Sequence, residues 1–170
     1  DVAMRVENFT VGSDKMIFET TKLVDQAGTD VAATAIAATS FDTLTGLDAG
    51  TASIAGAGDV IIELDSATLG IATDFAAATD AAIVTAVEAL FADATKFNTG
   101  VLAADYAEST NGEDLIFIIY ETASQGTTTD AVVMLAEGDT TDDAFDGEFT
   151  VLAVLQNITA DAITSADFVA

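Results

Sequence analysis

The chain has 170 residues, 51% of them hydrophobic, and carries a formal net charge of −25 because 29 acidic side chains face only four basic ones. This length accommodates one domain with a sizeable core, and the hydrophobic content excludes a disordered acidic tail. The negative charge excludes nucleic acid and anionic lipid as partners, and no apolar stretch approaches the roughly 20 residues that a membrane span needs.

The residue types of most catalytic sites are missing. Cys, His, Trp and Pro are all absent, which excludes zinc sites built on His or Cys, cysteine nucleophiles and Ser-His-Asp triads. A Ser–Lys pair needs the spacing S-x-x-K, which Ser13-Asp14-Lys15 lacks. A glycosidase would need two carboxyl groups held across a sugar-binding cleft, yet the aromatic platforms typical of such clefts are scarce. We therefore expect that the protein is not an enzyme.

The first predicted elements are two short strands around a turn. Residues 2–18 place apolar side chains on either side of Gly12-Ser13-Asp14, which favour the backbone angles of tight reversals. Residues 20–58 follow as an Ala- and Thr-rich stretch in which a strand and a weak helix are hard to tell apart. We expect residues 20–58 to be an irregular insertion in a single domain, residues 1–170.

A strand and the one predicted helix come next. Residues 59–65 predict a strand, and about residues 80–97 predict an amphipathic helix. Thr79 is its expected N-cap, and Asp80 lies in the first turn, where the helix dipole favours negative charge. Its apolar residues recur at helical spacing: Ile83, Val87, Leu90, Phe91 and Ala94. This narrow stripe indicates a helix packed across a sheet.

Three apolar runs are expected to form the centre of that sheet. Residues 115–120 follow the turn signal Asn111-Gly112 and are typical of a strand buried on both faces. Residues 131–136 and 149–155 are the other two runs, and residues 101–107 predict one more strand. Six phenylalanines are expected in the core: Phe9, Phe18, Phe41, Phe75, Phe91 and Phe117. The predicted fold is mainly β, a sandwich or β-roll-like sheet with the helix packed on it.

So many carboxylates need neutralisation, and calcium is the expected cation because it prefers hard oxygen ligands. The best candidate ligands share one acidic loop between two glycines: Asp139, Asp142, Asp143, Asp146 and Glu148. Asp14, together with Asp30, forms a second candidate. The loop does not have the ligand spacing of an EF-hand. The alternative is a solvated loop whose acidity keeps an Ala-rich surface soluble in salty water.

Both ends of the chain resemble one family. Residues 6–18 resemble the "I-x-D-F-x-x-G-x-D-x-I-D-L" segment that follows the calcium-binding repeats of bacterial RTX proteins, with Asn8 where that family usually has Asp. Residues 112–118 are similar to its "G-D-T-Y-L-F" strand. Residues 151–158 then precede 163–169, which are similar to its closing "L-T-x-x-D-F". No GGxGxDxUx repeat occurs, so the calcium sites of the family's β-roll are not carried over.

The resemblance implies export by the type I secretion machinery, guided by the C-terminus, with folding outside the cell in calcium. The chain begins at Asp1 with neither a Met nor a signal peptide, so we expect a fragment or a processed product. Two functions fit a secreted, calcium-stabilised protein. One is a structural subunit that self-assembles into a surface layer or filament through sheet edges or a donated strand such as residues 2–11. The alternative is the C-terminal secretion and folding module of a larger RTX enzyme or adhesin.

Overall fold

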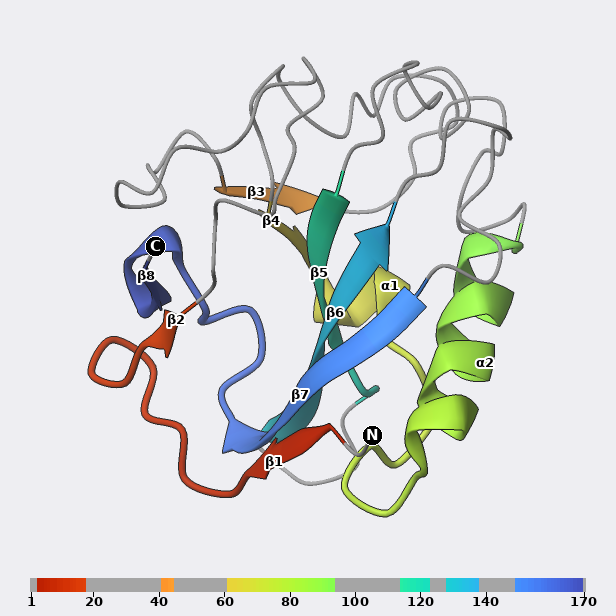
Figure 1. Ribbon diagram of the computed structural model, residues 1–170, viewed down its shortest axis with the longest axis horizontal. Helices are drawn as coiled ribbons and strands as arrows, with labels where there is room; N and C mark the ends of the chain where they lie inside the picture. The colour runs from red at the N-terminus through yellow and green to blue at the C-terminus, as the bar shows by residue number, and fades with distance from the viewer. Residues whose placement is uncertain are drawn as a thin grey trace.

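The computed structural model describes residues 3–17, 41–44, 61–93, 114–122, 128–137 and 149–169. Its main feature is a mixed sheet with the strand order β1-β7-β6-β5-β4-β3 (Figure 1). The strands of this sheet are β1 (Met4–Val6), β3 (Phe41–Leu44), β4 (Ile61–Leu64), β5 (Asp114–Tyr120), β6 (Thr129–Glu137) and β7 (Phe149–Ile158). A separate ladder pairs β2 (Met16–Ile17) with β8 (Phe168–Val169). The described helices are α1 (Ser66–Leu69), α2 (Asp80–Phe91) and the 3₁₀ turn η3 (Ser165–Asp167).

The three apolar runs form the centre of the sheet, as predicted. β5, β6 and β7 are neighbours in antiparallel order, and residues 115–120 of β5 are buried on both faces of the sheet. A strand covered on both sides has no need for polar alternation, which explains its continuous apolar sequence. The predicted class, mainly β with one helix packed on the sheet, is confirmed.

The outer strands pair in parallel. β4 joins β5, β3 joins β4, and β1 joins β7 at the other edge. Parallel neighbours need a crossover connection, and the one from β4 to β5 contains α1 and α2. β4 lies within the strand predicted at residues 59–65. β3 lies within the predicted insertion at residues 20–58, so part of that stretch belongs to the sheet edge.

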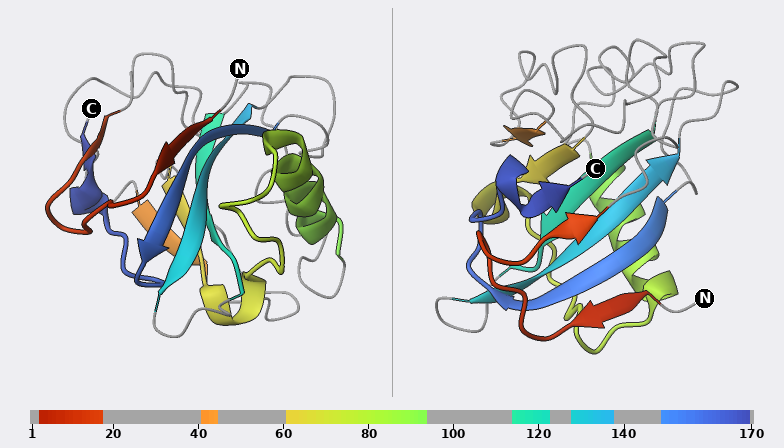
Figure 2. Two further views of the ribbon diagram at one scale, coloured as in Figure 1. Left: turned by 90° about the horizontal axis from the view of Figure 1, so that it is seen from below. Right: turned by 60° about the vertical axis from the view of Figure 1, so that its left-hand side comes forward.

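Helix α2 covers one face of the sheet (Figure 2). It begins as predicted, since the Thr79 side chain accepts a hydrogen bond from the Ala82 N–H at 3.3 Å. The sequence predicts that the helix continues to about Phe97, but in the structure it ends at Phe91. Phe91 makes the last buried contact, and Asp93 follows where the helix dipole disfavours an anion. The Phe91 ring packs 5.1 Å from both Phe117 and Phe149, measured between ring centroids.

The opposite face is covered by the two ends of the described chain. Phe9 from the N-terminal segment packs there with Ile163 and Phe168 from the C-terminal segment, over a cluster that includes Ile118 of β5. We call this the terminal face. Tyr120 is fully buried on it and donates a hydrogen bond to the carboxylate of Glu63, which is 2% exposed. A buried acid thus has a hydrogen-bond partner inside an apolar cluster.

The ends are joined by a second buried carboxylate. Gly12 adopts a φ of 80° in the predicted turn, a conformation that glycine tolerates without a Cβ clash. Its N–H donates to Asp167, and the N–H of Thr164 donates to the same carboxylate at 2.9 Å. Asp167 has no solvent exposure. The turn at Gly12 and the C-terminal segment at residues 164–167 therefore contact each other directly.

Some predictions fall outside the described residues: the strand at residues 101–107, the Asn111-Gly112 turn and the side chains of Phe18 and Phe41. The other four predicted core phenylalanines, Phe9, Phe75, Phe91 and Phe117, are buried. Among the described helices, none has the length and apolar character required to cross a bilayer.

Candidate metal centre

Three carboxylates meet at one end of the β5–β6 pair. Glu121 directly follows β5, Asp130 is the second residue of β6, and Asp74 lies in the loop between α1 and α2. Each contributes a carboxylate oxygen to a group in which all three oxygens lie within 4.8 Å of one another. We call this group the acidic triad. In the described part of the chain it is the one group of three or more potential metal ligands.

The sheet register explains why two of these residues meet. Tyr120 pairs with Ala131 across the antiparallel strands, and the Glu121 N–H donates to the Asp130 carbonyl at 3.0 Å. Residues opposite each other on such a pair project to the same face, and like charges there destabilise the sheet. The loop carrying Asp74 is anchored beside them, because the Thr122 N–H donates to the Ile71 carbonyl at 2.7 Å.

Backbone N–H groups hold one oxygen of each carboxylate. Phe75 donates to Glu121 at 3.1 Å, and Asn157 donates to Asp130 at 2.9 Å. The Ala77 N–H donates to Asp74 at 3.0 Å. The Asp130 backbone also contributes a hydrogen bond to the Glu121 carboxylate. These backbone hydrogen bonds orient the three carboxylates.

Burial and charge both act against ionisation of Glu121. Glu121 is 5% exposed and Asp130 is 7% exposed, whereas Asp74 lies at the surface. Burial raises the pKa of Glu121, and the negative charges of Asp130 and Asp74 raise it further. The two described basic side chains bind elsewhere, since Arg5 contacts Asp80 and Lys15 contacts the Ala166 carbonyl. A cation at the triad would remove this electrostatic cost.

The donor set fits a hard cation. Carboxylate oxygens suit calcium and magnesium, and the triad has one opening to solvent, at Asp74. Two oxygens bound to one calcium ion at about 2.4 Å are at most about 4.8 Å apart, so the triad spans one coordination sphere. The triad could therefore hold a metal ion, with water completing the shell.

None of the metal ligands predicted from sequence belongs to the triad. Asp139, Asp142, Asp143, Asp146, Glu148 and Asp30 lie outside the described residues. Asp14 is described and exposed, and its carboxylate accepts the Thr10 N–H at 2.7 Å, which stabilises the turn. Glu121 and Asp130 carry a sequence signal, because each flanks a buried strand of one antiparallel pair. Asp74 joins them through the tertiary fold alone.

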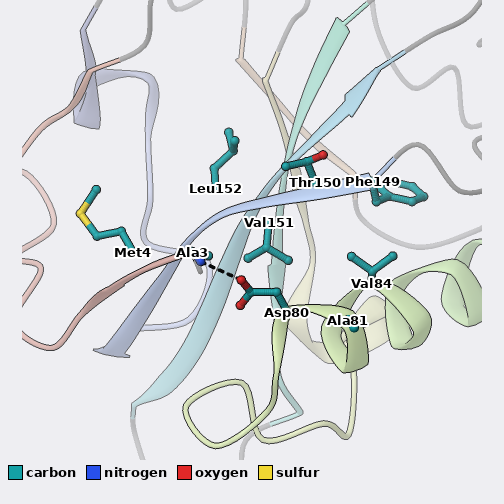
Figure 3. A pocket seen from close by; sticks show the side chains of 9 residues that line it. All are labelled: Ala3, Met4, Asp80, Ala81, Val84, Phe149, Thr150, Val151 and Leu152. Carbon is teal, nitrogen blue, oxygen red and sulfur yellow. Dashed lines mark hydrogen bonds between the residues drawn. The ribbon is translucent and has the colours of Figure 1, made fainter. Parts of the chain in front are cut away.

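A second feature is a groove beside the β1 edge of the sheet (Figure 3). It has a volume of about 440 Å³ and is lined by Ala3, Met4, Asp80, Ala81, Val84, Phe149, Thr150, Val151 and Leu152. We call it the edge groove. It exists because β1 starts to pair with β7 only at Met4 opposite Ala153, so the first residues of β7 extend beyond β1. Leu152 is an extra residue in the β7 register, a bulge that bends the strand at this point.

Among the described residues, Asp80 is the one ionisable side chain that lines the edge groove. The Ala3 N–H donates to it at 2.7 Å and Arg5 forms an ion pair with it at 3.1 Å. The Ala3 hydrogen bond and the Arg5 contact hold the pKa of Asp80 below its usual range, against a smaller effect of burial. Arg5 also donates to the Ala78 carbonyl at 2.8 Å. The carboxylate thus links β1 to the start of α2.

No family model, no curated protein and no solved structure matches this chain significantly. What the protein does must therefore be inferred from its own residues, above all from the acidic triad and the edge groove.

Proposed function

We propose that this chain is a non-catalytic extracellular structural protein, stabilised by calcium at the acidic triad and able to self-assemble through its sheet edge. The observation that carries the proposal is the acidic triad itself. Two buried carboxylates face each other across neighbouring strands, beside a third, with no cationic side chain among the described residues near them. Such a cluster is costly unless a proton or a cation neutralises it.

Calcium suits the triad better than other common ions. The chain has no His or Cys, so the soft and borderline metals lose their preferred ligands. Calcium accepts irregular oxygen cages with six to eight ligands, whereas magnesium demands a near-ideal octahedron and shorter bonds. An extracellular location supplies calcium at the concentrations that modest sites of this kind need.

The position of the triad favours a structural role for the ion. It lies where β5, β6 and the loop before α2 meet, and Asn157 of β7 is bonded to Asp130. An ion there would join the loop before α2 to three strands of the sheet. Binding to the folded state alone stabilises that state by mass action, so the ion would raise the unfolding free energy.

The β1 edge of the sheet supports assembly by exchange, in which the β1 segment of a second copy takes the place of β1 on β7 and beside Asp80. β1 is a three-residue edge strand whose Met4 side chain is 65% exposed. Its parallel pairing with β7 and its contacts with Asp80 are identical whether β1 comes from the same chain or from a neighbour. Exchange of an identical element is a low-cost route to oligomers, and an unclosed exchange generates filaments.

Two measurements test calcium binding at the acidic triad. They are calorimetric titration with calcium and thermal unfolding in calcium or in chelator. We expect one saturable site, a higher melting temperature in calcium, and loss of both in Glu121→Gln and Asp130→Asn. Glu7→Gln is the matched control, because Glu7 is an exposed acid in a turn far from the triad in sequence. Equal calcium responses in Glu121→Gln and Glu7→Gln would refute calcium binding at the triad.

Light scattering and negative-stain imaging of the same samples test assembly. We expect large regular assemblies in calcium that loosen on chelation. Met4→Lys should weaken them, because charge on an edge strand opposes pairing. Ile17→Lys is the control, since Ile17 is 77% exposed on β2, outside the main sheet. A compact monomer both in calcium and in chelator would refute assembly, and calcium binding at the triad could still be correct.

One observation favours the alternative, a secretion and folding module of a larger RTX-type protein. The two segments that resemble RTX termini are in contact through Gly12, Asp167 and the β2–β8 ladder. Deletion of residues 167–170 should then stop export of a fused carrier through a type I channel. Gly70→Ala, which weakens the fold away from the C-terminus, should leave export intact. Normal export of the deletion variant would refute this alternative.

A further inference from the structure

Two of the four asparagines begin the tripeptide Asn-x-Thr. They are Asn8-Phe9-Thr10 and Asn157-Ile158-Thr159, whereas Asn98 and Asn111 have no Ser or Thr two residues later. The middle residue is not proline in either case. This tripeptide is the acceptor sequence for N-linked sugars, and it functions only where the asparagine is accessible.

The two tripeptides have the same pattern of burial. Each middle residue is buried in the terminal-face cluster, Phe9 at 9% exposure and Ile158 at 2%. The asparagine and the threonine on either side of it are exposed in both. The two residues that an acceptor site requires are therefore both accessible in each tripeptide. In the described part of the chain neither asparagine side chain forms a hydrogen bond.

Both tripeptides also lie at the same place in the fold. β1 and β7 run in parallel with Val6 opposite Leu155, and each asparagine is two residues beyond its member of this pair. The two strands end side by side (Figure 1). Local geometry accounts for the asparagine at 157, whose φ is 57°, a conformation in which Asn is enriched. It does not account for an exposed threonine two residues later in both segments.

We propose that Asn8 and Asn157 are acceptor sites for N-linked sugar. The donor is an activated sugar joined through C1 to a diphosphate, carried by a lipid or a nucleotide. The side-chain nitrogen of the asparagine attacks C1, a C–N bond forms, and the C–O bond to phosphate breaks. The phosphate leaves with the electron pair and the amide nitrogen loses one proton. A separate glycosyltransferase performs the transfer, and the proposal rests on the export proposed above.

The position of the sites has a consequence for assembly. β7 has ten residues, a length of about 33 Å. The tripeptides lie at its C-terminal end, and the edge groove lies at its N-terminal end. Sugars would block lateral pairing at one end of this edge and leave the groove free at the other.

The test is peptide mapping by mass spectrometry of the protein from the cells that make it, in the extracellular and intracellular fractions. We expect sugar on Asn8 and Asn157 and none on Asn98 or Asn111. Thr10→Ala and Thr159→Ala should each lose the sugar from their own site, while Thr10→Ser and Thr159→Ser retain it. Thr150→Ala is the matched control, an exposed β7 threonine without an asparagine two residues before it.

The possible results of this experiment distinguish the two kinds of sugar donor and can also refute the inference. Sugar already present in the intracellular pool identifies a nucleotide-linked donor, and sugar confined to the exported pool identifies a lipid-linked donor. Unmodified Asn8 and Asn157 in the exported protein would overturn the inference, as would sugar that persists in the alanine variants. Unmodified protein that still binds calcium and assembles would overturn this inference alone and leave the proposed function standing.

Discussion

The buried hydrogen bond between Tyr120 and Glu63 ties two strands of the terminal face together. Tyr120 belongs to β5 and Glu63 to β4, and both are almost inaccessible to solvent. Burial raises the pKa of Tyr120, and the neighbouring Glu63 charge raises it further, so the hydroxyl stays protonated and remains a donor. Donation to a buried acid is worth more than a surface contact of the same geometry.

Tyr120→Phe keeps the ring and removes this donor. We expect the unfolding free energy to fall by about 1–3 kcal/mol, because the carboxyl group of Glu63 loses a hydrogen bond in a site that water does not reach. Urea denaturation measures the change. Glu63→Gln and the double variant complete a thermodynamic cycle. Strictly additive effects would contradict direct coupling between the two side chains.

We expect protons and calcium to compete for the carboxylate of Glu121. Its pKa is raised in the folded state, so without metal the folded state favours the protonated form. The associated stability is present below the ordinary glutamate pKa and is lost as pH rises through the raised value. Calcium needs the ionised form, so its affinity should fall as the pH is lowered from neutral through the raised pKa of Glu121.

Calorimetric titration of calcium across this pH range checks the prediction, with stability of the metal-free protein measured in parallel. In chelator, the wild type should become more stable relative to Glu121→Gln as pH falls over the same interval. A calcium affinity that is constant over the range would show that Glu121 is not a ligand.

At the scale of elements, the turn after α1 positions the loop that carries Asp74. Gly70 lies in this turn, and a Cβ on it would be 2.5 Å from the Ser66 carbonyl oxygen and 2.9 Å from a Thr122 methyl group. The Ser66 atom belongs to the backbone and cannot rotate away. The close approach therefore fixes how the loop crosses the end of β5.

Gly70→Ala is expected to lower the unfolding free energy by about 1–3 kcal/mol through this overlap. It should also weaken calcium binding, because the displaced loop carries Asp74. Gly12→Ala is the matched control: its Cβ meets nothing within 4 Å, and its cost of about 1–2 kcal/mol comes from the positive φ alone. Chemical denaturation and calorimetry measure both. Unchanged calcium affinity in Gly70→Ala would separate the loop from the metal site.

The elements that the sequence predicts well are those with a strong local signal. The three apolar runs and the start of α2 at Thr79 are as expected, because continuous burial and N-capping are visible in short windows. The strand at 41–44 was hidden in an Ala- and Thr-rich stretch without periodicity. The parallel pairing of β1 with β7 depends on contacts between distant segments, so no local pattern indicates it.

The candidate metal site was predictable only in its chemistry. Composition indicates that the many carboxylates need a cation. A sequence pattern shows only ligands that are close along the chain, such as those of the acidic loop at residues 139–148. Asp74, Glu121 and Asp130 are separated by strand register and by a crossover connection, so their convergence follows from the fold. An antiparallel alignment of residues 115–120 with 131–136 would have paired Glu121 with Asp130, but not Asp74.

For the whole molecule, the dominant property is self-repulsion among 29 acidic residues. Salt screens it, since the Debye length falls from about 8 Å at 0.15 M to about 3 Å at 1 M. We therefore expect the melting temperature to rise steadily with sodium chloride. Calcium chloride at equal ionic strength should add a further rise that saturates at low concentration. Glu121→Gln should keep the first effect and lose the second, and identical responses to the two salts would contradict specific binding.

The parallel pairing of the chain ends also delays completion of the fold during synthesis. β1 pairs with residues 153–155 and β2 with residues 168–169, so both N-terminal strands must wait for the last part of the chain. At about 5–20 residues per second, a ribosome needs roughly 7–30 s to synthesise the 149 residues between Met4 and its partner Ala153. Closure of such distant contacts is intrinsically slow. The chain therefore spends many seconds with the edge of its sheet unpaired by β1.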